Sequence, residues 1–213
     1  MAAQTILFAD YGKHAKPKRL YLDSSFAVAI LVYELNKTTT TPGILQPSHL
    51  ASYQFYQALI ADGVDLTGSV LTYTELLQYY CYIYPGGMFD LAKQYCKTTG
   101  AKGANRQERY KIFARDTAAC DAAWRKIAYR VAATEHFFAT HNILLRYPLP
   151  SPLLTNHTKN IVEYASILKD AYFAIEASDS LHLSLAHYLD SDAIVTLDSG
   201  FLTADSFKIY FTN

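Results

Sequence analysis

The stretch Ser178–Phe201 limits the folds open to this chain more than any other part of the sequence. Ser178 is a suitable helix N-cap, and apolar residues recur at helical spacing from Leu181 to Leu189. A short polar link then leads into Ala193–Leu197, a mostly apolar run that is typical of a buried strand. A helix that leads directly into a buried strand is a repeating unit of folds with a parallel sheet.

Strands and helices alternate in the rest of the chain as well. Further strands are predicted at Arg19–Leu22, Asp65–Leu71, Asn142–Tyr147 and Phe207–Phe211. Helices are predicted to start at Ser24, Pro47 and Thr72 and to span Thr158–Lys169. This alternation predicts an α/β fold with a mostly parallel central sheet.

The length of 213 residues suits one domain with a sizeable insertion. We treat residues 1–18, which end in a basic loop, as an N-terminal extension before the core. Residues 88–139 have the pattern of a basic, all-helical insertion. Within it, apolar residues at spacings of three and four from Tyr110 to Val131 predict one amphipathic helix of about 30 residues.

Composition and cysteine usage indicate a globular protein of a reducing compartment. Apolar residues make up 51% of the chain and charged residues 18%, which excludes a disordered protein. Three widely spaced cysteines without a C-x-x-C motif indicate neither a disulfide framework nor a zinc ribbon. The N-terminus lacks the pattern of a signal peptide, and the longest apolar run, Phe26–Tyr33, is too short to cross a bilayer. We therefore expect a soluble, cytoplasmic protein that does not involve a membrane.

The formal net charge of zero hides a strong asymmetry along the chain. Lys93–Arg130 contains ten Lys and Arg against three Asp and Glu, whereas Glu163–Asp205 contains eight Asp and Glu against one Lys. A basic segment and an acidic segment on one chain fit an acid-lined site that acts on a polyanion.

Four acidic residues are predicted to meet at one edge of the sheet. Asp23 and Asp198 end two predicted strands, and Glu75 lies one turn into the helix that follows another strand. Asp179 lies at the start of a helix that faces the same edge. Ligands of open parallel sheets bind outside the carboxyl ends of the strands. Clustered carboxylates there predict a site for Mg²⁺ or Mn²⁺, since these hard cations prefer oxygen ligands.

Each of these acids also has a local structural interpretation. Thr72-x-x-Glu75 matches a capping box, and Asp179 in a first helical turn could serve the helix dipole. Asp198 could begin a turn with Ser199-Gly200, and Asp23 could be an N-cap. Four such acids that gather by chance at one edge of the sheet are less expected than four acids that form one functional site.

Four motifs together resemble the PIN-domain nucleases, especially VapC-type toxins. They are L-D-S-S after the first strand, an early-helix T-x-x-E-L, then D-S-L-H-L-S-L-A and I-V-T-L-D-S-G-F. The resemblance covers about residues 19–80 and 140–211. The C-terminal pair of motifs is its specific part, and L-D-S-S alone is weak. The segment 88–139 departs from the compact members of the family because it is longer and more basic.

The resemblance implies an α/β/α three-layer sandwich and Mg²⁺- or Mn²⁺-dependent hydrolysis of RNA phosphodiester bonds. Asp23, Asp179 and Asp198 would hold metal, and Glu75 would bind a second ion or orient the attacking water. Ser24 and Thr196 would support these groups with hydrogen bonds. The resemblance also makes the toxin of a type II toxin–antitoxin pair the leading role. The expected partners are RNA, an antitoxin protein and a second copy of the chain in a homodimer.

The basic segment is the second indication of a function. Its candidates for binding RNA phosphates are Arg106, Arg109, Lys111, Arg115, Arg125, Lys126 and Arg130, the first four being the main ones. The alternative interpretation is a solvated helix face. His182 fits a packed histidine better than a metal ligand.

Two other functions remain open. The first is a non-catalytic PIN-fold module that binds RNA or protein. The second is an acid-phosphatase-like hydrolase with Asp23 as the nucleophile, which is disfavoured because Ser25 stands where a second Asp is expected.

Overall fold

The computed structural model describes residues 4–38, 45–146, 176–204 and 207–212. It divides into two compact units. Unit 1 comprises Met1–Tyr73 and Asn142–Asn213, and unit 2 comprises Thr74–His141. The expected helix Thr158–Lys169 lies outside the described residues.

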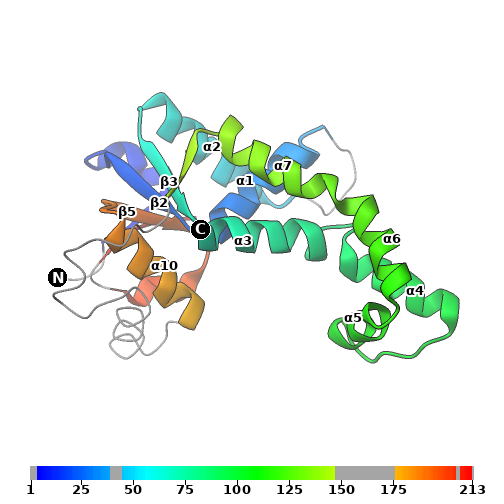
Figure 1. The fold of residues 1–213 in the computed structure, drawn as a ribbon. Helices are drawn as coiled ribbons and strands as arrows, with labels where there is room; N and C mark the ends of the chain where they lie inside the picture. The colour runs from blue at the N-terminus through cyan, green and yellow to red at the C-terminus, as the bar shows by residue number, and fades with distance from the viewer. Residues whose placement is uncertain (1–3, 39–44, 147–175, 205–206, 213) are drawn as a thin grey trace. The chain divides into compact units, whose positions relative to one another are not determined.

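Within the described residues, unit 1 is built on one sheet of six strands, all of them parallel, in the order β1-β6-β5-β2-β3-β4. Figure 1 labels its strands β2, β3 and β5. The strands are β1 (Gln4–Leu7), β2 (Arg19–Leu22), β3 (Asp65–Ser69), β4 (Ile143–Arg146), β5 (Ala193–Thr196) and β6 (Lys208–Phe211). The predicted α/β class and the parallel sheet are therefore confirmed. From β2 the chain continues outward to β3 and β4, whereas from β5 it continues to β6 on the other side. The order thus reverses between β2 and β5, which is the point where open α/β sheets bind their ligands.

Helices cover both faces of this sheet, as a three-layer α/β/α arrangement requires. They are η1 (Phe8–Lys13), α1 (Ser24–Asn36), α2 (Pro47–Ala61), α10 (Ala177–Tyr188) and η3 (Ser199–Thr203). Ile209 packs in a cluster with Leu183 and Leu185 of α10. The next residue, Tyr210, points to the opposite face and contacts the ring of Phe55 on α2, with 5.6 Å between the ring centroids. This alternation of side chains along a strand gives the sheet two apolar faces, and each needs a helical layer.

Unit 2 is helical. Its elements are η2 (Tyr79–Ile83), α4 (Met88–Thr99), α5 (Arg106–Ala114), α6 (Thr117–Ile127) and α7 (Tyr129–Thr140). The helix α3 (Val70–Gln78) begins in unit 1 and continues into unit 2. The core of unit 2 contains Cys81, Met88, Ala92, Phe113, Ala123 and Ile127.

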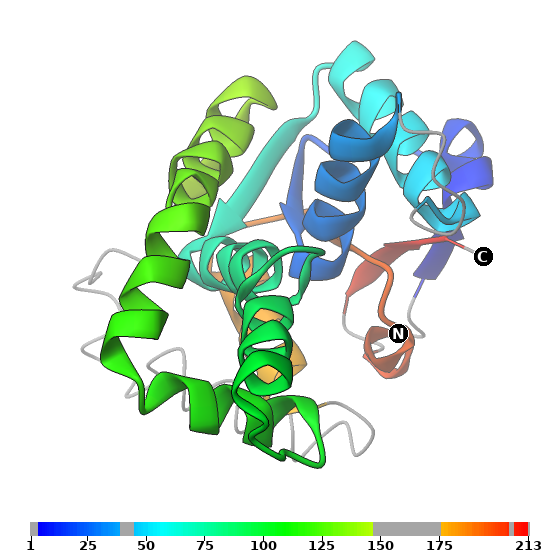
Figure 2. The same ribbon diagram turned by 90° about the vertical axis from the view of Figure 1, so that its right-hand side faces the viewer.

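The single 30-residue helix expected from Tyr110 onward is wrong, because the structure has three short helices there (Figure 2, in green). The break between α5 and α6 has a clear cause. Asp116 is the N-cap of α6, and its Oδ1 accepts a hydrogen bond from the N–H of Ala119 at 3.0 Å. Phe113 and Ile127 still share one core, which explains why the apolar spacing continues across the break.

Arg130 is not available to bind RNA, contrary to its place among the sequence candidates. It is 4% exposed, and its guanidinium donates hydrogen bonds to the carbonyl oxygens of Tyr80 and Pro85, the latter at 2.8 Å. The same guanidinium lies 4.8 Å from the ring centroid of Tyr80. Arg130 therefore stabilises the end of η2 inside unit 2.

The segment 1–18 is more than an extension before the core. Its strand β1 pairs in parallel with β6 and forms one edge of the sheet. Tyr11, on η1, is buried and packs edge-on against Phe55. The sequence gives little sign of this strand, because it is four residues long and only Ile6 is buried.

Two further expectations concern the strand at Asp65–Leu71 and helices that could span a membrane. The strand expected at Asp65–Leu71 ends at Ser69, because α3 already begins at Val70. Among the helices that the structure describes, none combines the length and apolar character needed to cross a bilayer.

Candidate metal centre

Asp23 lies at the point where the strand order reverses, between the end of β2 and the start of α1. Its N–H donates to the carbonyl oxygen of Val195 on β5 at 3.1 Å, which fixes its position between the two central strands. The residue is 3% exposed and is the N-cap of α1. The N-cap interpretation is therefore correct, although capping does not account for both oxygens of the carboxylate.

The two oxygens of the Asp23 carboxylate have different surroundings. Oδ2 accepts hydrogen bonds from the N–H of Ser25 at 3.2 Å, from the hydroxyl of Ser25, and from Oγ1 of Thr196 at 2.8 Å. Oδ1 instead faces Nε2 of His182 at 3.5 Å. Three donors hold one oxygen in place, and this orients the other toward the interior of the site.

Thr196 links the two acids that follow the central strands. Its Oγ1 donates to Asp23 and accepts a hydrogen bond from the N–H of Asp198 at 2.9 Å. Ser25 adds a second link, since its hydroxyl accepts from the N–H of Leu197 at 2.9 Å. The predicted support by Thr196 is thus present in the geometry. The serine that donates to Asp23 is Ser25, which the sequence did not single out, because the start of α1 turns Ser25 toward the carboxylate. The supporting role of Ser24 stays a prediction.

Asp198 follows β5 and is exposed. Its Oδ1 accepts a hydrogen bond from the N–H of Gly200 at 2.8 Å and caps the short helix η3, so the turn interpretation also holds. A Cβ at Gly200 would lie 2.9 Å from Oδ2 of Asp179 and 3.2 Å from Oδ1 of Asp198. The carboxylates of Asp179 and Asp198 therefore both border one glycine that has no side chain.

Asp179 lies in the first turn of α10 and is 8% exposed. Burial, together with the negative charges of Asp198 and Asp23, raises the pKa of this carboxyl to about 6, while His182 acts in the opposite direction. Asp179 is thus close enough to Asp198 and Asp23 for their charges to act on its carboxyl. The helix α10 begins at Ala177, with Glu176 as its N-cap instead of the predicted Ser178.

His182 lies one turn after Asp179 on α10 and is 1% exposed. Its Nδ1 is hydrogen-bonded to the hydroxyl of Tyr21 at 2.8 Å, and that hydroxyl also contacts Oγ of Ser69 at 2.8 Å. The histidine is packed, as the sequence suggested. Its other ring nitrogen nevertheless faces Asp23, a contact that the sequence pattern does not predict.

Glu75 is carried by α3, which follows β3 without a break. The expected capping box of Thr72 and Glu75 is not formed, because Ser69 caps α3. Oγ of Ser69 accepts from the N–H of Thr72 at 3.3 Å, and Oγ1 of Thr72 accepts from the N–H of Ser69 at the same distance. Oγ1 of Thr72 also donates to the carbonyl oxygen of Leu22 at 3.0 Å. Capping therefore does not explain Glu75.

Asp23 thus takes part in two contacts of the site: its Oδ1 lies 3.5 Å from Nε2 of His182, and its charge, with that of Asp198, raises the pKa of Asp179. The donor set fits a hard divalent cation, since it consists mainly of carboxylate oxygens. The raised pKa of Asp179 points the same way, because a cation would offset the repulsion among the acids.

No protein-family model matches the chain, and no curated protein matches it significantly. The chemistry of the site is therefore inferred from its motifs and its geometry.

Proposed function

We propose that this protein is a PIN-like endoribonuclease that depends on Mg²⁺ or Mn²⁺. The observation that carries the proposal is the meeting of Asp23, Asp179 and Asp198 where the strand order reverses. A structural cap needs one carboxylate, whereas the buried Asp179, whose pKa is raised by burial and by the charges of Asp198 and Asp23, is explained by a cation that binds among the three.

Each residue of the site would have its own role in the reaction. Asp23, Asp179 and Asp198 would hold the cation, and Glu75 would hold a second cation or orient the attacking water. A bound Mg²⁺ or Mn²⁺ supplies a water of lowered pKa and offsets the charge of the phosphate. Thr196 and Ser25 keep Asp23 in one orientation by hydrogen bonds to Oδ2.

The proposed substrate is RNA. The support comes from the four motifs and from the basic segment Lys93–Arg130, whose excess of positive charge suits a polyanion. The proposed biological role is the toxin of a toxin–antitoxin pair. A small DNA-binding protein encoded next to this gene, which blocks the cleavage when it is added, would support that role.

The test is cleavage of a fluorescent RNA by the full chain with Mg²⁺ or Mn²⁺, and again with excess EDTA. We expect cleavage that EDTA stops, and a loss larger than about 100-fold in Asp179→Asn and Asp198→Asn, since even residues that only orient metal ligands commonly contribute about 10–100-fold. Asp190→Asn is the matched control because Asp190 is an exposed acid of the link after α10, with a positive φ of 53° that Asn tolerates. RNA that is bound but not cleaved by the parent protein would instead indicate a binding module.

A further inference from the structure

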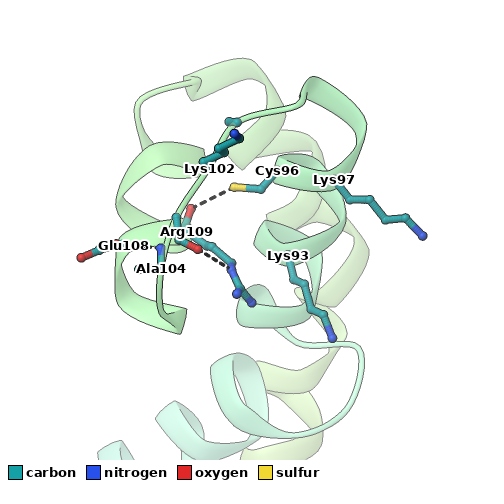
Figure 3. A pocket seen from close by; sticks show the side chains of 9 residues that line it. Lys93, Cys96, Lys97, Lys102, Ala104, Glu108 and Arg109 are labelled. Carbon is teal, nitrogen blue, oxygen red and sulfur yellow. Dashed lines mark hydrogen bonds between the residues drawn. The ribbon is translucent and has the colours of Figure 1, made fainter.

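Unit 2 contains a hollow of about 680 Å³ (Figure 3). None of the residues that line it belongs to the acidic site. The hollow lies between α4, α5 and the loop that joins them. Its lining residues are Lys93, Cys96, Lys97, Ala101, Lys102, Gly103, Ala104, Glu108 and Arg109. The lining thus combines four cations with a single acid.

The wall of this hollow is fixed by specific contacts. Gly100 ends α4 with a φ of 73°, a conformation that favours glycine. A Cβ at Gly103 would lie 2.8 Å from Cγ of Arg109, so the loop can approach α5 only because residue 103 has no side chain. Nε of Arg109 donates to the carbonyl oxygen of Gly103 at 3.0 Å, and Sγ of Cys96 donates to the carbonyl oxygen of Arg109 at 3.8 Å (Figure 3).

The positive charge of the hollow is not neutralised locally. Within the described residues, Lys93, Lys97 and Lys102 are exposed and have no ion-pair partner. The one acid of the lining, Glu108, is already engaged, since its Oε2 accepts a hydrogen bond from the N–H of Ala104 at 2.8 Å. The hollow therefore offers its cations to an external anion.

A second hollow of about 310 Å³ adjoins the first and shares Lys93 and Lys97 with it. Its remaining lining residues are Gly86, Asp90 and Gln94. Asp90 is engaged as well, because its Oδ2 accepts from the N–H of Gly86 at 2.9 Å. Two neighbouring hollows that share the same two lysines suit a chain of linked anions better than a single small one.

We propose that these two hollows bind successive phosphates of a single-stranded RNA backbone. The inference rests on the proposed function for the identity of the polyanion. Neither lining includes an aromatic side chain on which a base could stack, so the contact would not depend on base sequence. Of the main sequence candidates only Arg109 lines the hollow, whereas the guanidinium of Arg106 lies over the ring of Phe89 at 5.3 Å.

The test is the affinity of the full chain for a short fluorescent single-stranded RNA, measured by anisotropy in EDTA between about 50 and 200 mM salt. Lys93→Gln combined with Lys97→Gln removes the two shared cations. We expect this variant to reduce the slope of log affinity against log salt by about 1 to 1.5, since each lost phosphate contact on a single strand is worth about 0.7. Circular dichroism checks that the helices are retained.

The matched control is Arg125→Gln combined with Lys126→Gln, which removes the same charge from exposed positions of α6 that line neither hollow. We expect this control to change the slope by less than half as much. Equal changes in the two variants, or no change in either, would overturn the proposal. Displacement of the RNA by low millimolar inorganic phosphate at constant ionic strength would assign the hollows to free phosphate and would also overturn it.

A separate measurement distinguishes failure of this inference from failure of the proposed function. Hydrolysis of bis(p-nitrophenyl) phosphate with Mn²⁺ by the parent protein tests the acidic site without a nucleic acid strand. Hydrolysis together with an unaltered salt slope in the lysine variant would overturn only the binding proposal. Absence of hydrolysis together with the expected slopes would overturn only the nuclease proposal.

Discussion

Thr196 and Asp23 are joined across the two central strands by a hydrogen bond of 2.8 Å from Oγ1 of the threonine to Oδ2 of the carboxylate. The same Oγ1 accepts the N–H of Asp198 at 2.9 Å. One buried hydroxyl therefore sets the position of the acid that follows β2 and of the acid that follows β5. It lies where the strand order reverses, so the sheet itself orients the candidate metal ligands.

Thr196→Val should destabilise the protein and weaken metal binding. The substitution removes a donor from a buried carboxylate, which commonly costs about 1.5–3 kcal/mol. Thr67→Val is the matched control, because Thr67 is equally buried on β3 and its hydroxyl has no partner among the described residues. We expect the control to leave the free energy of unfolding unchanged or to raise it. Urea denaturation measures the free energy of unfolding of both variants. Equal losses of stability in the two would contradict the hydrogen bond between Thr196 and Asp23.

Ser25→Ala should lower both stability and cleavage, whereas Ser24→Ala should affect neither. The hydroxyl of Ser25 donates to Asp23 and accepts the N–H of Leu197, so its loss removes two contacts of the site. We expect a destabilisation of about 1–2 kcal/mol for Ser25→Ala. For Ser24→Ala we expect a change within about 0.5 kcal/mol, as for most surface substitutions. A larger effect of Ser24→Ala than of Ser25→Ala would show that Ser24, and not Ser25, faces Asp23 at the start of α1.

Gly200→Ala should weaken divalent-metal binding without unfolding the protein. Its Cβ would lie 2.9 Å from Oδ2 of Asp179, so the carboxylate must move away from its present place. We expect metal affinity to fall by at least about 10-fold, the lower end of what misplaced ligands cost. Gly12→Ala is the control, because a Cβ there meets nothing within 4 Å. Calorimetric titration with Mn²⁺ compares the two, and an unchanged affinity in Gly200→Ala would contradict the placement of Asp179.

The stability of the metal-free protein should depend on pH through Asp179. Its pKa is raised from 3.8 to about 6 in the folded state, so the folded protein binds this proton more tightly than the unfolded chain. Stability should therefore fall as the pH rises from about 4 to 6, by up to about 3 kcal/mol, because the unfolded state releases the proton first. Urea midpoints in EDTA measure this fall, and Asp179→Asn should lack most of it. The same pH dependence in the parent and the variant would contradict the prediction.

The central strands could be predicted from the sequence because they are buried. The expected strand Arg19–Leu22 coincides with β2, and Ala193–Leu197 exceeds β5 by one residue. The edge strand β1 could not be predicted, since only Ile6 of its four residues is buried. One helix is predicted from Tyr110 onward because the apolar spacing gives no sign that Asp116 caps a new helix, α6.

The positions of Asp23, Asp179 and Asp198 could be predicted because each directly follows a strand or lies in the first turn of a helix. Their hydrogen-bond partners could not. Whether Ser24 or Ser25 contacts Asp23 depends on a rotation of α1 by one residue, which no local pattern specifies. His182 could have been found from its spacing of three residues from Asp179, which puts both side chains on one face of α10.

The most direct test of the metal centre is the titration of Mn²⁺ into the full chain, followed by the electron paramagnetic resonance of the free ion. We expect saturable binding of Mn²⁺ by the parent protein and by Asp190→Asn, because Asp190 lies outside the site. We expect a loss of affinity larger than about 100-fold in Asp23→Asn, since Asp23 faces His182 and its charge acts on Asp179. Mn²⁺ that stays free at millimolar protein concentration, or equal binding by Asp23→Asn and the parent, would contradict the account.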